Sequence, residues 1–231
     1  MTAVRALVVA KAPVPGLAKT RLGALVGHDV AADLAAAALL DTLDACAEAF
    51  GRCHLALAGD LEDACRSAEL RSRLRSWDVF PQEGGSLGDR LAHAHRAVAA
   101  DRPGGVVQVG MDTPQVTPAL LLEAAGCLRP GGGVLGPAED GGWWLLGLDD
   151  PRSARVLGDV PMSTARTGAD TRAALEGAGV SVVATRGLRD VDTVEDARLV
   201  ARGAPGSRFA HAWSGVSTAH HPGALTSGVT S

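Results

Sequence analysis

The sequence predicts an α/β domain with a mainly parallel, helix-covered sheet. Short apolar runs of the kind found in buried strands alternate with longer segments that have helical patterns, and this alternation is typical of such a fold. The hydrophobic fraction is 46% and the charged fraction 21%, as in ordinary globular proteins. A length of 231 residues is enough for one domain with a substantial core.

The predicted elements follow one another in regular alternation. Strands are expected at residues 4–10, 53–58, 77–80, 106–109, 134–135, 143–148 and 180–184. Helices are expected at residues 29–50, 61–75, 87–100, 164–177 and 193–202, with a further helix opened by Thr117 and Pro118.

The C-terminal segment differs in composition from the rest. We expect the folded domain to cover residues 1–203, and residues 204–231 to form a disordered tail. This tail is rich in Gly, Ala, Ser, Pro and His and has little periodicity. Phe209 and Trp213 are the two side chains that could hold part of it against the domain.

Charge and hydropathy exclude some partners. The net charge is −4 and no basic stripe is present, so nucleic acid is not expected as a partner. The apolar run at residues 6–10 is too short for a secretion signal or a membrane span. We therefore expect a cytoplasmic protein without a membrane partner.

The segment KAPVPGLAKTRL, after the first strand, is a candidate phosphate-binding loop. Its Lys19-Thr20 ending is like that of a P-loop, GxxxxGK[ST]. However, Pro13 and Ala18 stand where that motif needs glycine, and proline removes a backbone N–H donor. The segment is therefore not a P-loop.

A different phosphate loop remains open. Gly16 could form the turn, and Lys19 and Arg21 could reach a phosphate group. Among the 22 lysine and arginine residues, only Lys11 and Lys19 are lysines, and both lie in this loop. The alternative is a surface turn with solvated cations.

Acidic residues follow two other elements. Asp112 lies in GMDTP, directly after the strand at 106–109, where it could ligate a hard cation. It could equally form an Asx-turn or cap a helix. Asp190 and Asp192 alternate before the last helix, so in an extended segment they share a face and could both approach a cation.

The segment GPAEDGGWW, at residues 136–144, combines glycines, Glu139, Asp140 and two tryptophans. Glycine lets a backbone approach a ligand closely, so an acceptor pocket is one interpretation. A β-hairpin turn is the other, because Asp-Gly is a strong hairpin signal. Both can hold at once.

The segment Gly84-Gly85-Ser86-Leu87-Gly88 matches the GxSxG motif of serine hydrolases. A nucleophile elbow needs a strand that runs directly into the serine, and residues 81–83 intervene here. A serine hydrolase is therefore not expected.

Five motifs together resemble the GT-A superfamily of nucleotide-dependent transferases. Within it, the chain resembles the small bacterial radical-SAM/selenodomain-associated, or arsenosugar-type, glycosyltransferases, which are similar in turn to 2-phospho-lactate guanylyltransferases. The motifs cover roughly residues 4–200 in family order: AKAPVPGLAKTRL, QEGGSLGDRL, GMDTP, GPAEDGGWWLLGL and DVDTVEDA.

This resemblance implies a role for each motif. Catalytic roles are implied for Asp112, Asp140 and Lys19. A divalent cation would be held by Asp112, with Asp190 or Asp192 as second acidic contact. The nucleotide would be bound by Lys11, Gly16, Lys19, Thr20, Arg21, Gln82, Gly85 and Leu87. The acceptor would be bound by Glu139, Asp140, Gly141, Gly142 and Trp143. The chain departs from the family pattern in that Asp112 is the only carboxylate of its motif, so a full Asp-x-Asp pair is absent.

The resemblance implies a glycosyltransferase that depends on Mg²⁺ or Mn²⁺ and uses a nucleotide-sugar donor and a small-molecule acceptor. The first alternative is a nucleotidyltransferase that joins an NTP to a phosphorylated small molecule and releases pyrophosphate. Lys19 and Arg21 favour this alternative, because a triphosphate needs more positive charge than a diphosphate. The second alternative is an inactive GT-A domain that only binds a nucleotide or a protein partner.

Overall fold

The computed structural model describes residues 4–219. Within them, seven strands form one sheet in the spatial order β3-β2-β1-β4-β6-β5-β7. The strands are β1 (Arg5–Lys11), β2 (Cys53–Ala58), β3 (Asp78–Pro81), β4 (Val106–Val109), β5 (Gly132–Pro137), β6 (Trp143–Leu148) and β7 (Ser181–Ala184).

The sheet is mainly parallel, as predicted. Strands β3, β2, β1 and β4 pair in parallel, and β5 pairs in parallel with β7. Strand β6 is antiparallel to both of its neighbours, β4 and β5, with an irregularity at Gly136/Pro137. The β5–β6 hairpin therefore brings the segment between these strands to the same edge of the sheet as the carboxyl ends of β1 and β4.

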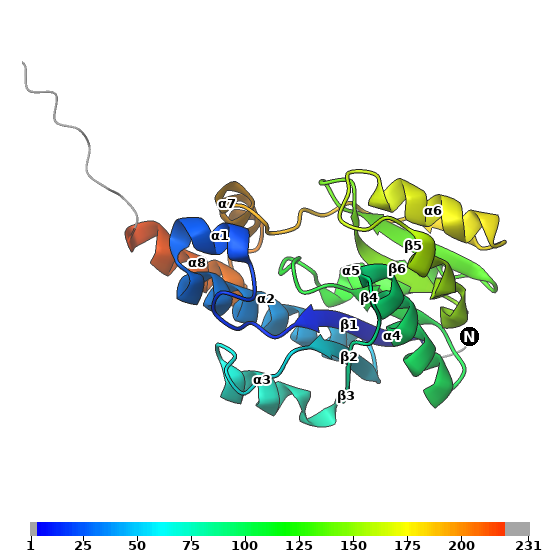
Figure 1. Ribbon diagram of the computed structural model, residues 1–231, viewed down its shortest axis with the longest axis horizontal. Coiled ribbons are helices and arrows are strands. Elements are labelled where there is room, and N and C mark those ends of the chain that lie inside the picture. The colour runs from blue at the N-terminus through cyan, green and yellow to red at the C-terminus, as the bar shows by residue number, and fades with distance from the viewer. Residues whose placement is uncertain (1–3, 220–231) are drawn as a thin grey trace, which may run out of the picture.

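Helices connect the strands. They are α1 (Thr20–Val26), α2 (His28–Ala49), α3 (Ser67–Arg73), α4 (Leu87–Asp101), α5 (Pro118–Cys127), α6 (Thr167–Gly177), α7 (Val194–Gly203) and α8 (Arg208–Ala219), with 3₁₀-helices η1 (Leu74–Ser76) and η2 (Pro151–Asp159). Figure 1 shows α1, α2, α7 and α8 gathered at one end of the molecule and α6 at the other. None of the helices within residues 4–219 is long and apolar enough to cross a membrane.

Strand β1 illustrates how both faces of the sheet are covered. Ala6, Val8 and Ala10 belong to a hydrophobic cluster with residues of α2, α3 and α5. Leu7 faces the other way and packs with Ala94 of α4. Because side chains alternate along a strand, a continuous apolar run means that both faces are buried. The helices thus form a layer on each side of the sheet.

Several elements differ from the sequence-based expectation. Helices α1 and α8 and the 3₁₀-helix η2 were not predicted. The helix expected at 61–75 begins only at Ser67, because Arg66 has a left-handed backbone with φ 54°. The helix expected at 164–177 begins at Thr167, since Ser163 has φ 60° and the Thr167 N–H closes a tighter turn onto the carbonyl of Thr164.

The GxSxG segment begins α4. The Ser86 hydroxyl accepts the Asp89 N–H at 3.1 Å, and the Asp89 carboxylate accepts the Ser86 N–H at 3.0 Å, which forms a capping box. A Cβ on Gly88 would lie 2.0 Å from the carbonyl oxygen of Leu157 in η2. This glycine therefore allows α4 and η2 to pack closely, and the motif has a structural explanation.

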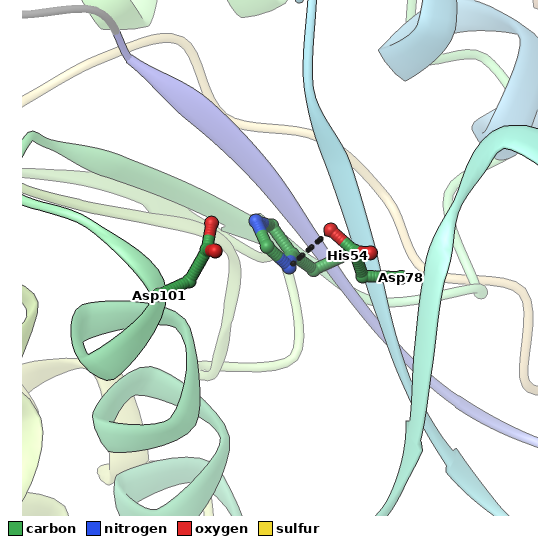
Figure 2. A group of neighbouring side chains, drawn as sticks. All are labelled: His54, Asp78 and Asp101. Atoms are coloured by element: carbon green, nitrogen blue, oxygen red, sulfur yellow. Dashed lines mark ion pairs between the residues drawn. The ribbon is translucent and has the colours of Figure 1, made fainter.

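Two histidines are buried in the described chain. His95 of α4 is fully buried, and its Nε2 lies 2.8 Å from Gln108 Oε1. His54 of β2 is 3% exposed, with Nδ1 3.6 Å from Asp78 Oδ2 (Figure 2). Burial lowers the pKa of both imidazoles, that of His95 to about 4. Both rings are therefore neutral at pH 7.

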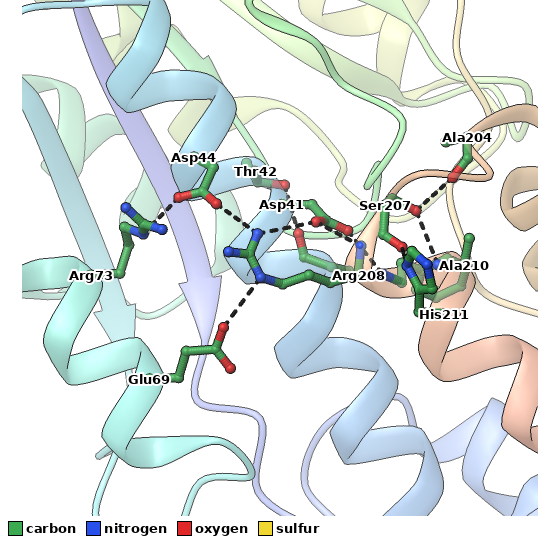
Figure 3. A network of polar contacts seen from close by, with 12 residues as sticks. Asp41, Thr42, Asp44, Glu69, Arg73, Ala204, Ser207, Arg208, Ala210 and His211 are labelled. Carbon is green, nitrogen blue, oxygen red and sulfur yellow. Dashed lines mark hydrogen bonds and ion pairs between the residues drawn. The ribbon is translucent and has the colours of Figure 1, made fainter.

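Helix α8 is anchored to α2 by a polar network at its first turn (Figure 3). The Asp41 carboxylate accepts the backbone N–H groups of Arg208 and Phe209, at 3.0 and 2.9 Å. The Arg208 guanidinium reaches Asp44 at 2.6 Å and Glu69 at 3.2 Å. A carboxylate from α2 thus satisfies N–H groups that a helix start leaves without partners.

The apolar face of α8 also packs against the domain. Phe209 is 1% exposed, and Trp213 is buried in the same cluster with residues of α1, α2 and α7. The structure therefore differs from the expectation of a disordered tail over residues 208–219, and the folded part extends beyond residue 203. The rest of the expected tail, residues 220–231, lies outside the described residues.

The buried His95 predicts that stability falls in mild acid. In the unfolded chain a histidine takes up a proton near pH 6.5, whereas folded His95 stays neutral until about pH 4. The free energy of unfolding should therefore decrease as the pH falls, and His95 alone should contribute a loss of about 2 kcal/mol between pH 7 and pH 5. Urea unfolding at both pH values measures this loss.

The matched variant is His95→Gln, which removes the titrating group and keeps a side chain able to hydrogen-bond Gln108. The variant should lose about 2 kcal/mol less than the wild type between pH 7 and pH 5. An identical pH dependence in the two proteins would contradict the buried, neutral state of His95.

Docking of α8 predicts a large effect of Phe209→Ala. Loss of this buried ring should reduce the free energy of unfolding by about 3–5 kcal/mol, measured by urea denaturation. The control is Leu122→Ala, because Leu122 of α5 is 52% exposed and its loss should change stability by about 0.5 kcal/mol or less. Equal effects of the two substitutions would mean that α8 does not pack on α2 in solution.

Candidate functional site

Two cavities lie side by side at the carboxyl ends of β1 and β4. The lysine cavity, of about 290 Å³, is lined by Lys11, Leu17, Ala18, Lys19, Thr20, Arg21, Met111, Asp112 and Asp192. The tryptophan cavity, of about 280 Å³, has Asp112, Asp140, Asp190, Trp143, Trp144 and Ser163 among its lining residues. Met111 and Asp112 line both. The two cavities are therefore neighbouring parts of one candidate site.

The loop between β1 and α1 brings Lys19 into this site. Gly16 has φ 75°, a left-handed conformation that glycine adopts at little cost, so the chain turns sharply there. The N–H groups of Leu17 and Ala18 both bond to the carbonyl of Val14. Lys19 itself has φ 48° and directly precedes α1. The loop thus turns back toward the sheet and places Lys19 at its carboxyl edge.

The Lys19 ammonium is enclosed by oxygen atoms. It lies 2.7 Å from Asp112 Oδ1 and 3.1 Å from Asp192 Oδ1, and it donates a hydrogen bond to the carbonyl of Val191. Its side chain is only 10% exposed. Burial by itself would lower the pKa of Lys19, but the two carboxylates outweigh burial and raise it. Lys19 is therefore a fixed positive charge of the lysine cavity, next to Asp112, which lines both cavities.

Asp190 has a different environment. It lines the tryptophan cavity, and its Oδ1 is buried without a hydrogen-bond partner. Burial and the nearby carboxylates of Asp112 and Asp140 raise the pKa of Asp190 to about 7, although Lys19 opposes the shift. Three carboxyl groups therefore repel one another in a partly enclosed space, which a positive charge bound among them would relieve.

The candidate metal ligands are close but not clustered. In the described part of the chain, the only group of three acidic, histidine or cysteine residues with ligand atoms within 4.8 Å of one another is His54, Asp78 and Asp101. Asp112, Asp190 and Asp192 do not form such a group. Two of them, Asp112 and Asp192, contact Lys19 instead.

Gly141, in the turn between β5 and β6, is needed for packing. Gly141 has φ 90°, and a Cβ there would lie 2.1 Å from the carbonyl oxygen of Ala165. The Gly168 N–H donates to the Gly141 carbonyl at 2.8 Å. Gly142 lines the tryptophan cavity, but Gly141 does not. The Gly-Gly pair thus seats the start of α6 against this turn, and only one of the two borders the cavity.

The two carboxylates of this turn, those of Glu139 and Asp140, have different environments. Asp140 lines the tryptophan cavity, and its Oδ1 accepts the Gly142 N–H at 2.8 Å. Glu139 lines neither cavity and pairs with Arg189. The structure therefore places Asp140, but not Glu139, in contact with the candidate acceptor space.

Both tryptophans line the same cavity. The Trp143 indole N–H donates to Thr171 Oγ1 at 3.2 Å, and the Trp144 N–H donates to the carbonyl of Arg186 at 2.8 Å. Trp144 is buried, whereas Trp143 is half-buried. The hydrogen bonds fix both rings, so the cavity has a rigid aromatic wall.

Of the three nucleotide-binding residues that the resemblance implies in the segment before α4 and at its start, one lines the site. Leu87 lines the tryptophan cavity and is 43% exposed. Gln82 lines neither cavity, and its Nε2 donates to the carbonyls of Ala10 and Ala56. Gly85 also lies outside both cavities. Gln82 thus ties the ends of β1 and β2 together.

Several lining residues were missed by sequence reasoning. They are Gln108, Met162, Ser163, Thr164 and Thr167. Gln108 is the one polar residue of the buried strand β4, which is a signal that could have pointed to it. Met162, Ser163 and Thr164 lie in the loop before α6 and Thr167 is the first residue of this helix, and no motif marks any of them.

Comparison with known proteins identifies a matching protein family and a solved structure with a similar fold. The model of the DUF2064 family, described as an uncharacterized protein conserved in bacteria, matches residues 41–164. A candidate nucleotide-diphospho-sugar transferase from Desulfovibrio desulfuricans G20 is 28% identical, with a TM-score of 0.80 over 93% of this chain and 94% of that chain. No curated protein matches the chain.

More distant solved structures share the fold. A cytidylyltransferase from Leptospira borgpetersenii serovar Hardjo-bovis is 11% identical, with a TM-score of 0.57 over 95% of both chains. CMP:2-keto-3-deoxy-manno-octonic acid synthetase, in complex with CTP, is also 11% identical, with a TM-score of 0.56 over 88% of this chain and 99% of that chain.

These similarities confirm the predicted fold, which is that of nucleotide-diphospho-sugar transferases. The closer relation to radical-SAM-associated glycosyltransferases or to guanylyltransferases stays a prediction. The family match spans more than half of the 231 residues and includes Asp112 and Asp140. The chain belongs to the DUF2064 family of bacterial proteins.

Proposed function

We propose that the protein is a divalent-metal-dependent glycosyltransferase with a nucleotide-sugar donor and a small-molecule acceptor. The comparisons support the broader class, a nucleotide-dependent transferase. The observation that carries the finer proposal is the pair of cavities that meet at Asp112. A group transfer needs two reactants held next to each other, and neighbouring subsites provide this.

The lysine cavity suits the phosphates of the donor. Lys11, Lys19, Thr20 and Arg21 line it, and Arg21 has no carboxylate partner within the described chain. Cations and hydroxyl groups on a short loop are suitable ligands for phosphate oxygens. In this proposal the loop holds and orients the diphosphate, and Gly16 gives it the required turn.

The tryptophan cavity suits a polar acceptor with an apolar face. Its wall contains Trp143 and Leu87, and its polar groups include Asp140, Ser163 and Thr164. Asp140 Oδ1 is occupied by the Gly142 N–H, which leaves Oδ2 without a protein partner. We assign Asp140 as the base that accepts the proton of the acceptor hydroxyl.

The acidic residues fit a divalent cation. The unpartnered Oδ1 of Asp190 and the mutual repulsion of Asp112, Asp140 and Asp190 are what a bound cation would offset. Oxygen ligands of this kind suit Mg²⁺ or Mn²⁺, held by Asp112, Asp190 and Asp192. Such an ion would stabilise the charge that develops on the phosphate leaving group.

A nucleotidyltransferase is the second candidate. It is favoured by the three cationic side chains of the lysine cavity, those of Lys11, Lys19 and Arg21, because an NTP carries more charge than a nucleotide sugar. The acceptor phosphate would then occupy the tryptophan cavity and attack the α-phosphate, with pyrophosphate as leaving group.

Thermal-shift measurements with Mg²⁺ or Mn²⁺ separate these functions. A ligand that binds only the folded state raises the melting temperature, and at 100 times its Kd it adds about 3 kcal/mol of stability. We expect a metal-dependent shift with one nucleotide sugar that is larger than with the four NTPs. A shift with one NTP alone would favour nucleotidyl transfer.

Asp112→Asn is the variant that tests the site. It should lose the metal-dependent shift and turnover, since it removes a charged ligand and keeps the shape of the side chain. The matched control is Asp63→Asn, at an exposed position with no ion pair in the described chain, which should behave as the wild type. Metal-dependent nucleotide binding without turnover on any acceptor would indicate the inactive binding domain.

Lys19→Met tests the role of the buried ammonium. Because Lys19 contacts both Asp112 and Asp192, it competes with a divalent cation for these carboxylates. Its removal should tighten Mn²⁺ binding to the nucleotide-free protein by about 10-fold or more, and weaken donor binding. Titration of Mn²⁺ by calorimetry measures the first effect.

Lys11→Met is the matched control, because it removes the only other lysine of the same loop, and Lys11 has no ion pair within the described residues. Mn²⁺ binding should change much less in this variant. If both variants changed Mn²⁺ affinity equally, the effect would come from overall charge, and the competition would be disproved.

A further inference from the structure

A second group of residues that could ligate a metal lies at the amino ends of the parallel strands, opposite the candidate transfer site. His54 is near the start of β2 and pairs in register with Asp78, the first residue of β3. Asp101 is the last residue of α4. One ligand atom from each residue lies within 4.8 Å of the other two, and no other such group occurs in the described part of the chain. Figure 2 shows the imidazole ring between the two carboxylates.

The His54 ring lacks hydrogen bonds although it is buried. Its Nε2 is buried without a partner, and its Nδ1 is 3.6 Å from Asp78 Oδ2, which is too far for a hydrogen bond. His95, the other buried histidine, has a partner for its Nε2 at 2.8 Å, although its Nδ1 is also buried without one, whereas neither nitrogen of His54 has a hydrogen-bond partner in the described chain. A group bound between His54 and the two carboxylates would give this buried ring the partner that it lacks.

We propose that His54, Asp78 and Asp101 form a site for a divalent transition metal such as Zn²⁺. One imidazole nitrogen and two carboxylate oxygens suit Zn²⁺, with water as the fourth ligand. Imidazole argues against Mg²⁺ or Ca²⁺, which prefer oxygen. Burial keeps His54 neutral, the form that has a lone pair for a metal.

Arg52 pairs with both carboxylates of this group. Its guanidinium lies 2.8 Å from Asp78 Oδ2 and 3.0 Å from Asp101 Oδ2. A metal ion and a guanidinium would repel each other there, so they exclude one another. The Arg52 side chain is 38% exposed and can turn into solvent. Arg52 therefore competes with the metal for the two carboxylates.

Arg5 does not take part in this exchange. It is only 3% exposed, and it donates to the carbonyls of Val98 and Gly104 at 2.8 and 3.0 Å. Its closest approach to Asp101 is 3.9 Å. Arg5 thus stays in place and holds the end of α4. A bound metal would join β2, β3 and α4 at this edge, away from the transfer site, and would stabilise the fold.

The test uses metal-free protein with Asp112→Asn, so that the proposed transfer site contributes less to binding. Co²⁺ and Zn²⁺ are the probes, with visible absorption of bound Co²⁺ and the melting temperature as readouts. Adding Arg52→Gln should give one bound Co²⁺ per chain and tighten Zn²⁺ binding by about 10-fold or more. Adding His54→Gln to the protein with Asp112→Asn and Arg52→Gln should abolish the binding of Co²⁺ and Zn²⁺.

Arg73→Gln is the matched control, because Arg73 is also a partly exposed arginine in an ion pair, at 2.6 Å from Asp44 and 43% exposed, and it pairs with none of the three proposed ligands. It should leave metal affinity unchanged. The proposal is overturned if the Arg52→Gln and Arg73→Gln proteins bind Co²⁺ and Zn²⁺ with equal affinity, or if neither protein binds these metals. It is also overturned if the Arg52→Gln protein still binds them after His54→Gln is added. Should His54→Gln fail to fold, Asp78→Asn replaces it, since Asp78 is half exposed.

Discussion

The ion pairs of the buried Lys19 ammonium are the interaction on which the candidate site depends. They join the loop after β1 to Asp112, which follows β4, and to Asp192, which precedes α7. A buried ammonium is strongly unfavourable without partners, so the two carboxylates and the Val191 carbonyl are needed for the loop to adopt this position. The Val191 N–H in turn donates to the Asp112 carbonyl at 2.9 Å. Three segments far apart in the sequence are thus fixed around one positive charge.

The sheet and the convergence of Lys19, Asp112, Asp190 and Asp192 could be predicted from the sequence. The reason is general: parallel strands present their carboxyl ends at one edge, and the loops that follow these strands meet there. The position of Glu139 outside both cavities could not be predicted in this way. It is adjacent to Asp140, but neighbouring side chains in a turn point in different directions, and Arg189 pairs with Glu139 from another segment.

Features that depend on tertiary packing were also not predictable. Helix α8 has the composition of a tail, yet Asp41 of α2 accepts hydrogen bonds from its first turn. A hydrophobic cluster of residues from α1, α2 and α7 receives Phe209. The loop at Ser163 borders the tryptophan cavity only because Gly141 allows it to approach. In both cases the contacting residue is far away in the sequence, so a local sequence pattern cannot predict the contact.

Charge balance in the lysine cavity bears on the choice between donors. Lys19 is already neutralised by Asp112 and Asp192, so Lys11 and Arg21 are the cations left for a ligand in the described structure. Two positive charges match a diphosphate better than a triphosphate, which is a physical reason to prefer a nucleotide sugar. A divalent cation that took Asp112 and Asp192 from Lys19 would add its own charge and release that of Lys19. We therefore expect donor affinity to depend strongly on metal, and more so for a triphosphate than for a diphosphate.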